Sequence, residues 1–134
     1  MYKLIKITNA GCNVPEPMRL SLKNDTVCDR GVPFYLSDGT FTPVTSGTKR
    51  LPTHMTICES DGKDVLCYEI TSQMVFAVKA EGSPADMTVG SEYLLSANGT
   101  AVSLTKATGD LRGALLLSKN GASKAGDEIL VAFR

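Results

Sequence analysis

The residues best suited to nucleophilic chemistry are His54, the only histidine, and Cys58, which follows it by four positions. A histidine that activates a thiol must lie within hydrogen-bond reach of it. Two strand residues at this spacing are separated by more than about 10 Å, since a strand rises about 3.3 Å per residue. We therefore expect His54 to be a loop or surface residue, and we predict no catalytic site and no enzyme.

Two short polar segments superficially match known chemical motifs. Ser37-Asp38-Gly39-Thr40 contains the residue types of an aspartic-protease motif, but in the wrong order, and an Asp-Gly step is typical of a hairpin turn. The basic segment Gly47-Thr48-Lys49-Arg50 lacks the glycine pattern of a phosphate-binding loop. We expect a solvated loop at Lys49 and Arg50, or alternatively a contact with an acidic patch on another protein.

The cysteines are widely and irregularly spaced, at positions 12, 28, 58 and 67. A zinc site would favour close pairs, which this chain lacks. The first residues contain lysines but no long apolar stretch, so we expect no secretory signal and therefore reduced thiols that pack as small apolar groups. We predict neither a metal nor a cofactor.

Composition limits the partners that the chain can have. It has 134 residues, with 14 Lys and Arg balanced by 14 Asp and Glu. This length fits one domain with a core of its own. Zero net charge removes the electrostatic attraction to nucleic acid, and no apolar run approaches the roughly 20 residues of a membrane span. We expect neither nucleic acid nor a membrane as a partner.

Turn signals recur about every ten residues and predict an all-β protein. Asn-Gly and Asp-Gly steps bound short β-prone runs, and no segment has a helical period. The strands are expected near residues 2–7, 33–37, 40–44, 54–59, 64–70, 74–80, 92–96, 100–105, 112–117 and 128–133. We predict a small single-domain β-barrel of the SH3-like or β-tulip type.

The N-terminal 30 residues differ from the remainder. Pro15 and Pro17 lack amide donors, which excludes a central strand there, so residues 8–17 are expected to form an extended arm or an edge. Residues 2–7 have apolar side chains on both faces, so that strand is either covered by the domain or pairs elsewhere. We divide the chain into an N-terminal strand with its arm (1–30) and a barrel body (31–134).

The body contains an internal sequence repeat. Residues 31–40 resemble 90–100, residues 54–62 resemble 113–121, and residues 65–70 resemble 129–133. We interpret these as two similar three-strand meanders that are joined by residues 74–80 and close together into one barrel. Residues 74–80 are the most apolar strand, and Met74 and Phe76 on one face are expected in the core or, alternatively, at an oligomer contact.

Several segments together resemble small head proteins of tailed bacteriophages of Gram-positive hosts. They are Tyr2-Lys3-Leu4-Ile5-Lys6-Ile7-Thr8-Asn9, Val14-Pro15-Glu16-Pro17, Val65-Leu66-Cys67-Tyr68-Glu69-Ile70, Met74-Val75-Phe76, Val89-Gly90, Asn98-Gly99-Thr100-Ala101-Val102 and Ala125-Gly126-Asp127-Glu128-Ile129-Leu130-Val131-Ala132-Phe133. The resemblance covers nearly the whole chain. The four cysteines and the Lys49-Arg50 loop depart from the family pattern.

This resemblance implies a capsid decoration, or cement, protein. Such a protein is made in the host cytoplasm, binds the outer surface of the capsid, often as a trimer, and braces neighbouring copies of the major capsid protein. We expect the contacts with the capsid, or with a neighbouring copy, to come from the arm and the basic loop: Tyr2, Leu4, Ile5, Ile7, Val14, Pro15, Pro17, Lys49 and Arg50. The alternatives are a head–tail connector or tail-tube component with a similar barrel, and a soluble barrel that binds a small ligand.

Overall fold

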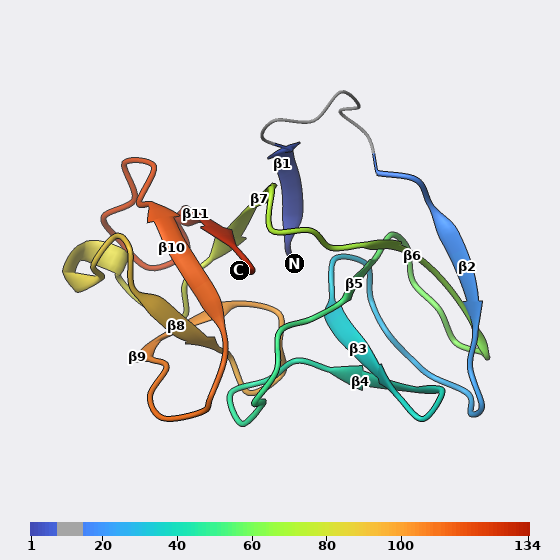
Figure 1. Cartoon of the computed structure of the whole chain (residues 1–134). Helices are drawn as coiled ribbons and strands as arrows, with labels where there is room; N and C mark the ends of the chain where they lie inside the picture. The colour runs from blue at the N-terminus through green and yellow to red at the C-terminus, as the bar shows by residue number, and fades with distance from the viewer. Residues whose placement is uncertain (8–14) are drawn as a thin grey trace.

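The computed structural model describes residues 1–7 and 15–134. Within these residues eleven strands form two antiparallel sheets, which confirms the predicted all-β class (Figure 1). In spatial order, sheet A comprises β1 (Lys3–Ile7), β7 (Met74–Lys79), β11 (Glu128–Ala132), β10 (Ala114–Ser118), β8 (Glu92–Leu95) and β9 (Val102–Lys106). Sheet B comprises β2 (Met18–Ser21), β6 (Asp64–Glu69), β5 (His54–Thr56), β3 (Pro33–Ser37) and β4 (Thr40–Pro43). One turn of 3-10 helix, η1 (Pro84–Asp86), precedes β8.

The expected single closed barrel is wrong. Each sheet instead curls on itself: in sheet A the amide of Glu81, just after β7, donates to the carbonyl of Val102 in β9 at 2.8 Å. The Lys23 amide donates to the Gly39 carbonyl at the corresponding place in sheet B, at 3.1 Å. The chain therefore forms two curled sheets, with both chain ends lying between them (Figure 1).

The internal repeat is real, but its unit has five strands rather than three. The strand order β2-β6-β5-β3-β4 in sheet B recurs as β7-β11-β10-β8-β9 in sheet A. The segment expected to be a linker is thus the first strand of the second unit. We call residues 18–69 the first unit and residues 74–132 the second unit.

The predicted Asp-Gly turn is confirmed. Ser37 pairs with Thr40, and Asp38 and Gly39 between them have φ angles of 51° and 77°. Positive φ at both central residues gives the tight hairpin whose twist matches that of its strands. This turn, rather than a carboxylate site, explains the motif.

The N-terminal residues contribute one strand to each sheet. β1 lies at the edge of sheet A, whereas β2, a strand that the sequence did not predict, lies at the edge of sheet B. The middle of the expected arm, residues 8–14, lies outside the described residues. Both described parts of the N-terminal segment are therefore built into the sheets.

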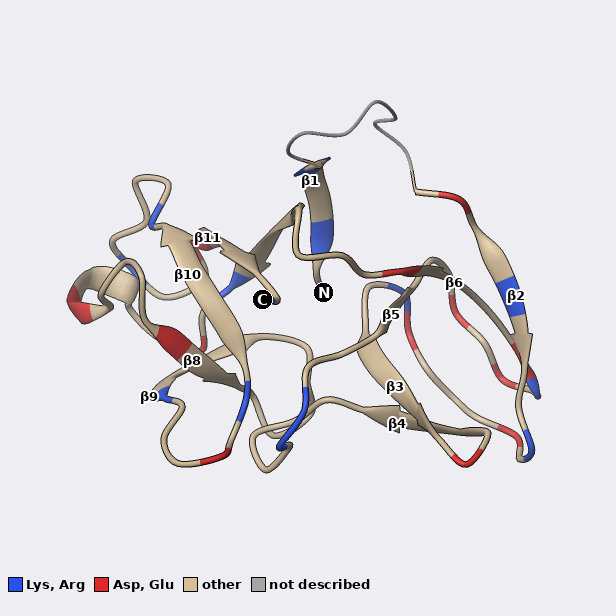
Figure 2. Ribbon diagram, viewed as in Figure 1, with Lys and Arg blue, Asp and Glu red and all other residues tan. Residues whose placement is uncertain are grey.

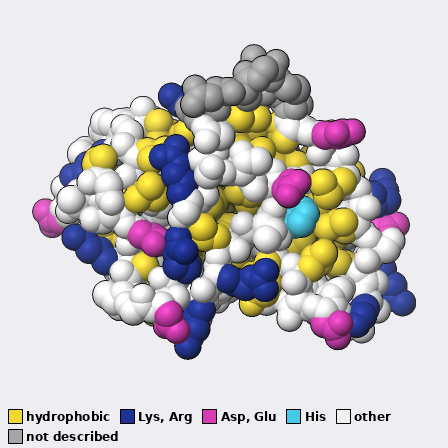
Figure 3. All heavy atoms as spheres, viewed as in Figure 1, with side chains coloured by type: hydrophobic (Ala, Val, Ile, Leu, Met, Phe, Trp, Pro, Cys, Tyr) yellow, Lys and Arg dark blue, Asp and Glu magenta, His cyan; other side chains and the backbone are white. Residues whose placement is uncertain are grey.

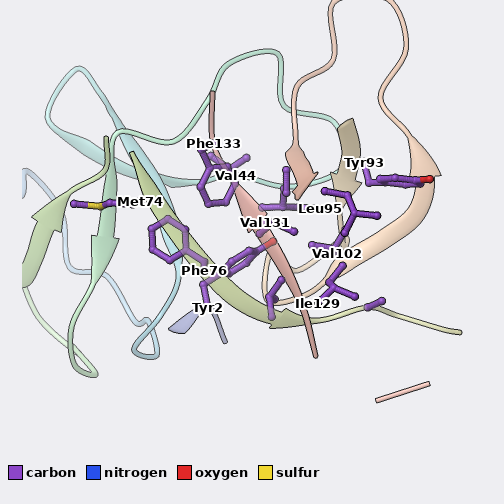
Figure 4. Packing of buried hydrophobic residues seen from close by; sticks show 14 of the residues in the cluster. Tyr2, Val44, Met74, Phe76, Tyr93, Leu95, Val102, Ile129, Val131 and Phe133 are labelled. Atoms are coloured by element: carbon purple, nitrogen blue, oxygen red, sulfur yellow. The ribbon is translucent and has the colours of Figure 1, made fainter. Parts of the chain in front are cut away.

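The main hydrophobic core lies inside the second unit and extends to the first. Fully buried Phe76, Leu95, Ile129 and Val131 form its centre (Figure 4). A smaller cluster within the first unit contains the buried residues Leu22, Phe34, Val65 and Cys67. The core of the first unit is the smaller of the two, so this unit buries fewer apolar side chains.

Candidate interaction surface

Among the described strands, β1 has one edge without a partner. It pairs with β7 on one side only, and the register shifts between Leu4 and Lys6, which leaves Ile5 as the extra residue of a β-bulge. At its start, the Tyr2 amide donates to the Gly31 carbonyl of the first unit at 3.0 Å. An edge strand of this kind can accept a further strand from a partner.

Three of the predicted interface anchors are used inside the molecule. Tyr2 is only 3% exposed, and its ring lies 6.5 Å from that of Phe76 and 5.5 Å from that of Phe133 (Figure 4). Leu4 and Ile7 are partly buried against the same core. Tyr2 is thus corrected to a core residue, whereas Leu4 and Ile7 keep part of their surface exposed, so a partner contact at these two residues stays a prediction.

Ile5 is the predicted anchor on β1 that is exposed. Its side chain is 53% exposed, and Met1 nearby in the chain is 44% exposed. Lys3 on the same strand forms an ion pair with Glu128, at 3.0 Å between nitrogen and oxygen. The bulge therefore presents an apolar side chain beside a charged pair.

A groove of about 390 Å³ lies between β1 and the first unit. It is lined by Met1, Tyr2, Lys3, Leu4, Arg30, Gly31, Thr56, Ile57 and Tyr68. Burial raises the pKa of Tyr68 from its ordinary value of about 10 to about 12. The groove is thus apolar, and its rim carries the cationic Lys3 and Arg30.

Gly31 shapes the floor of this groove. Its φ of +69° suits glycine, and a Cβ there would come within 2.7 Å of the Tyr2 carbonyl oxygen. Sequence reasoning missed the groove because its walls come from residues 1–4, 30–31, 56–57 and 68, which are distant in the chain. The Gly31 turn signal was visible, but nothing in it indicated β1 as the neighbour.

The predicted basic loop lies at the junction of the two units (Figure 2). Lys49 forms an ion pair with Asp110 at 3.1 Å, and the Arg112 amide donates to the Thr48 carbonyl at 2.9 Å. The Arg50 guanidinium lies 4.2 Å from the centre of the Tyr35 ring. This stacking orients a cation without neutralising it.

Pro15 and Pro17 precede β2 at the edge of sheet B. The Leu22 amide donates to the carbonyl of Lys63, the residue before β6, at 2.7 Å. Backbone amides alternate in direction along a strand, so those of Met18 and Leu20 also point toward β6. The backbone nitrogen of Pro17 therefore points away from the sheet. Proline sacrifices no inter-strand hydrogen bond there, and it prevents another strand from pairing with this edge. Val14, the remaining predicted arm contact, lies outside the described residues.

Met74 and Phe76 are core residues, with exposures of 3% and 0%. The structure thus selects the core alternative and corrects the expected oligomer contact at these two positions. β7 lies between β1 and β11, and its inward face meets both units. The exposed large apolar side chains are Met1, Ile5, Val27, Val89 and Leu104.

The side chain of His54, the base considered in the sequence, contacts Thr53 and Phe34. The Nδ1 atom of His54 lies 2.7 Å from the hydroxyl of Thr53, and its ring stacks on Phe34 at 5.5 Å. Burial lowers the pKa of His54, while Glu69 opposes that shift. His54 therefore packs against an aromatic ring, where burial disfavours its protonated form.

The described cysteines are free thiols in three different environments. Cys67 is fully buried, Cys28 is partly buried and Cys58 is exposed, so the expectation of core thiols is correct only for Cys67. Burial raises the pKa of Cys67 to about 11. Cys12 lies outside the described residues, and among those described no group of three His, Cys, Asp or Glu side chains is placed to hold a metal.

Comparison with known proteins adds no relatives. The sequence matches no protein-family model and no curated protein. Among the described residues, no helix is both long enough and apolar enough to cross a membrane.

Proposed function

We propose that this chain is a structural virion protein that binds the outer surface of a bacteriophage capsid and braces neighbouring copies of the major capsid protein. The resemblance of its segments to phage head proteins motivates the proposal. The observation that carries it is the free edge of β1, with the exposed Ile5 and the apolar groove beside it. An adhesive protein needs such a surface and no reacting groups.

The β1 edge supplies two kinds of binding energy. Main-chain hydrogen bonds from an added capsid strand give affinity, and a side chain inserted into the groove gives specificity. Burial of Ile5 contributes about 2 kcal/mol, which corresponds to roughly thirtyfold in affinity at each site. On a shell that offers many equivalent sites, this contribution decides the occupancy.

Lys49 and Arg50 provide a second, electrostatic contact. Arg50 is held over Tyr35 and is exposed, so it can meet a carboxylate of the capsid surface without reorganising. Contacts between exposed charges weaken as salt rises. Binding through this loop should therefore be salt-dependent, whereas binding through Ile5 should not.

The test is to measure occupancy on capsids of the phage whose genome encodes the chain, after the native protein has been omitted. Ile5→Asp is compared with Val89→Asp, because the two side chains are similarly exposed, at 53% and 55%. We expect wild type and the Val89 variant to saturate the shell and the Ile5 variant to bind at least tenfold more weakly. Equal binding by both variants would refute the role of β1, and no binding by wild type would refute decoration.

A further inference from the structure

Two segments of the first unit, residues 28–32 and residues 56–60, lie antiparallel to each other beside the groove. At one end of the pair, Cys28 and Ser60 exchange both backbone hydrogen bonds, at 2.9 and 3.0 Å, in an isolated β-bridge. A hydrogen-bonded antiparallel pair has its Cα atoms about 5.5 Å apart and both side chains on one face. The side chains of Cys28 and Ser60 therefore share a face.

Thr56 holds the other end of the two segments together. Its amide donates to the Val32 carbonyl at 3.1 Å, and its carbonyl accepts from the Gly31 amide at 2.9 Å. Its buried hydroxyl accepts from the Val32 amide at 2.9 Å and donates to the Asp29 carbonyl at 2.7 Å. The segments cannot separate without breaking these hydrogen bonds.

Cys58 lies in the middle of the second segment, two residues before Ser60. Residues two apart on an extended chain share a face, so Cys58 is a diagonal neighbour of Cys28 across the pair. In a regular ladder the Cα atoms of diagonal neighbours are roughly 7–8 Å apart, whereas a disulfide joins Cα atoms up to about 6.8 Å apart. The chain bends at Ile57 and at the exposed Cys58, so a shift of about 1 Å there brings the two thiols into range.

The thiols of Cys28 and Cys58 interact electrostatically although both are free. Burial is the main cause that raises the pKa of Cys28, and the charges of Asp29 and Cys58 raise it further, against a hydrogen bond from the Ser60 backbone that lowers it. Cys58 is exposed, whereas Cys28 is partly buried. A reagent from solvent therefore meets the Cys58 thiol first.

A hollow of about 320 Å³ opens beside Cys28. All three charged residues among those that line it, Asp29, Glu59 and Asp61, are acidic. On the face seen in Figure 3, by contrast, Lys and Arg side chains are interspersed with Asp and Glu. Carboxylates repel an anionic reagent, so a neutral reagent suits this hollow best.

We propose that Cys28 and Cys58 form a reversible disulfide when the chain meets a small neutral disulfide. The Cys58 thiolate attacks one sulfur of the reagent, forms a mixed disulfide and releases the first reagent thiol. The Cys28 thiolate then attacks the Cys58 sulfur, which forms the bond between the two cysteines and releases the second reagent thiol. The cysteines lose two electrons, the reagent gains them, and the two cysteine protons end on the released thiols.

This bond adds a covalent link to one wall of the groove. Arg30 and Gly31 line the groove and lie on the first segment, while Thr56 and Ile57 line it from the second. A disulfide between the segments fixes these two sides of the wall to each other. The inference is separate from capsid binding, since the bond forms in the isolated chain.

The experiment uses the full chain with Cys12→Ser, which removes the thiol outside the described residues. The reduced protein is incubated with hydroxyethyl disulfide without denaturant, free thiols are alkylated, and mass spectrometry of the intact protein and its peptides identifies the products. Cys28→Ser and Cys58→Ser in the same background are the matched variants, and the buried Cys67 is an internal control. Circular dichroism establishes that each protein is folded, and alanine replaces serine in a variant that is not.

We expect the parent protein to lose two hydrogens in mass and to give a peptide pair linked through Cys28 and Cys58. Neither single variant should give this pair. The mixed disulfide at Cys58 should be roughly tenfold more abundant in Cys28→Ser than in the parent, because that variant lacks the neighbouring thiol that displaces the reagent.

A mixed disulfide at Cys58 that is equally abundant in the parent and in Cys28→Ser would overturn the inference. So would a linked pair that forms only in urea, or one that joins Cys67.

Discussion

Met18 and Phe76 occupy the same position in two repeated units, yet Phe76 is fully buried and Met18 is partly exposed. Each residue pairs with the equivalent residue of its neighbouring strand, Cys67 for Met18 and Val131 for Phe76. The backbone of the two units is therefore alike, whereas their environments differ. The second unit provides most of the stability, and the first unit keeps surface available for contacts.

Alanine substitution at these two positions should separate the roles. Phe76→Ala removes a fully buried ring and should lower the free energy of unfolding by about 3–5 kcal/mol. Met18→Ala should cost roughly 1 kcal/mol, because its side chain is already partly in water. Urea unfolding measures both changes, and equal losses would contradict the unequal burial of the two units.

Tyr2 should behave as a core residue rather than as a surface anchor. Tyr2→Ala should destabilise the fold by about 3 kcal/mol or more, since the ring packs between Phe76 and Phe133. Tyr2→Phe removes only the hydrogen bond from the hydroxyl to the Ala101 carbonyl, which is 3.3 Å long, and should cost roughly 1 kcal/mol. A stable Tyr2→Ala variant with weakened capsid binding would instead restore the anchor role.

His54 should make the fold less stable in mild acid. Burial lowers the pKa of His54 in the folded protein, so the unfolded chain binds its proton more readily. Its contribution to the free energy of unfolding is highest above the ordinary histidine pKa of about 6.5 and falls as pH drops toward the lowered value. His54→Asn should flatten this part of the stability profile, and an NMR titration that gives a pKa above 6.5 would contradict the assignment.

Thiol labelling should distinguish the described cysteines. Exposed Cys58 should react with a thiol reagent in the native protein, whereas Cys67 should react only on unfolding. Both burial and its pKa of about 11 keep the Cys67 thiolate scarce. Peptide mapping after brief labelling identifies the modified residue, and early labelling of Cys67 would show that the concave side of the first unit opens readily.

Arg50 should act on capsid binding through charge. Arg50→Ala should weaken binding severalfold at low salt and make little difference at high salt, since exposed charge pairs are screened. Lys23→Ala is a matched control because Lys23 is also exposed, and it forms an ion pair with Asp38 at a loop distant from the junction. Loss of binding that is the same at every salt concentration would assign Arg50 a structural role over Tyr35.

Local signals predicted most of the fold. Turns such as Asp38-Gly39 and the alternating runs between them located ten of the eleven strands of the described chain. β2 was missed because Pro15 and Pro17 argue against a strand, although they block only the outward side of an edge. The repeat was visible in the sequence, but its five-strand unit was not, because β2 and β7 share almost no residue types.

The candidate surface was only partly predictable. Alternation in residues 3–7 shows which side chains share a face, but not which face the sheet covers. Ile5 is exposed because a bulge shifts the register at that point, and no pattern in the sequence marks the bulge. The groove beside it arises from contacts between the two units, which depend on tertiary packing.

The proposal that this chain coats a phage capsid is tested most directly by a cryo-EM map of particles from the phage that the proposal takes as its source. The account predicts density for the two curled sheets in many copies over the outer surface of the shell, with β1 against the major capsid protein. Density confined to a ring at the tail vertex, or particles that lack the chain altogether, would contradict it.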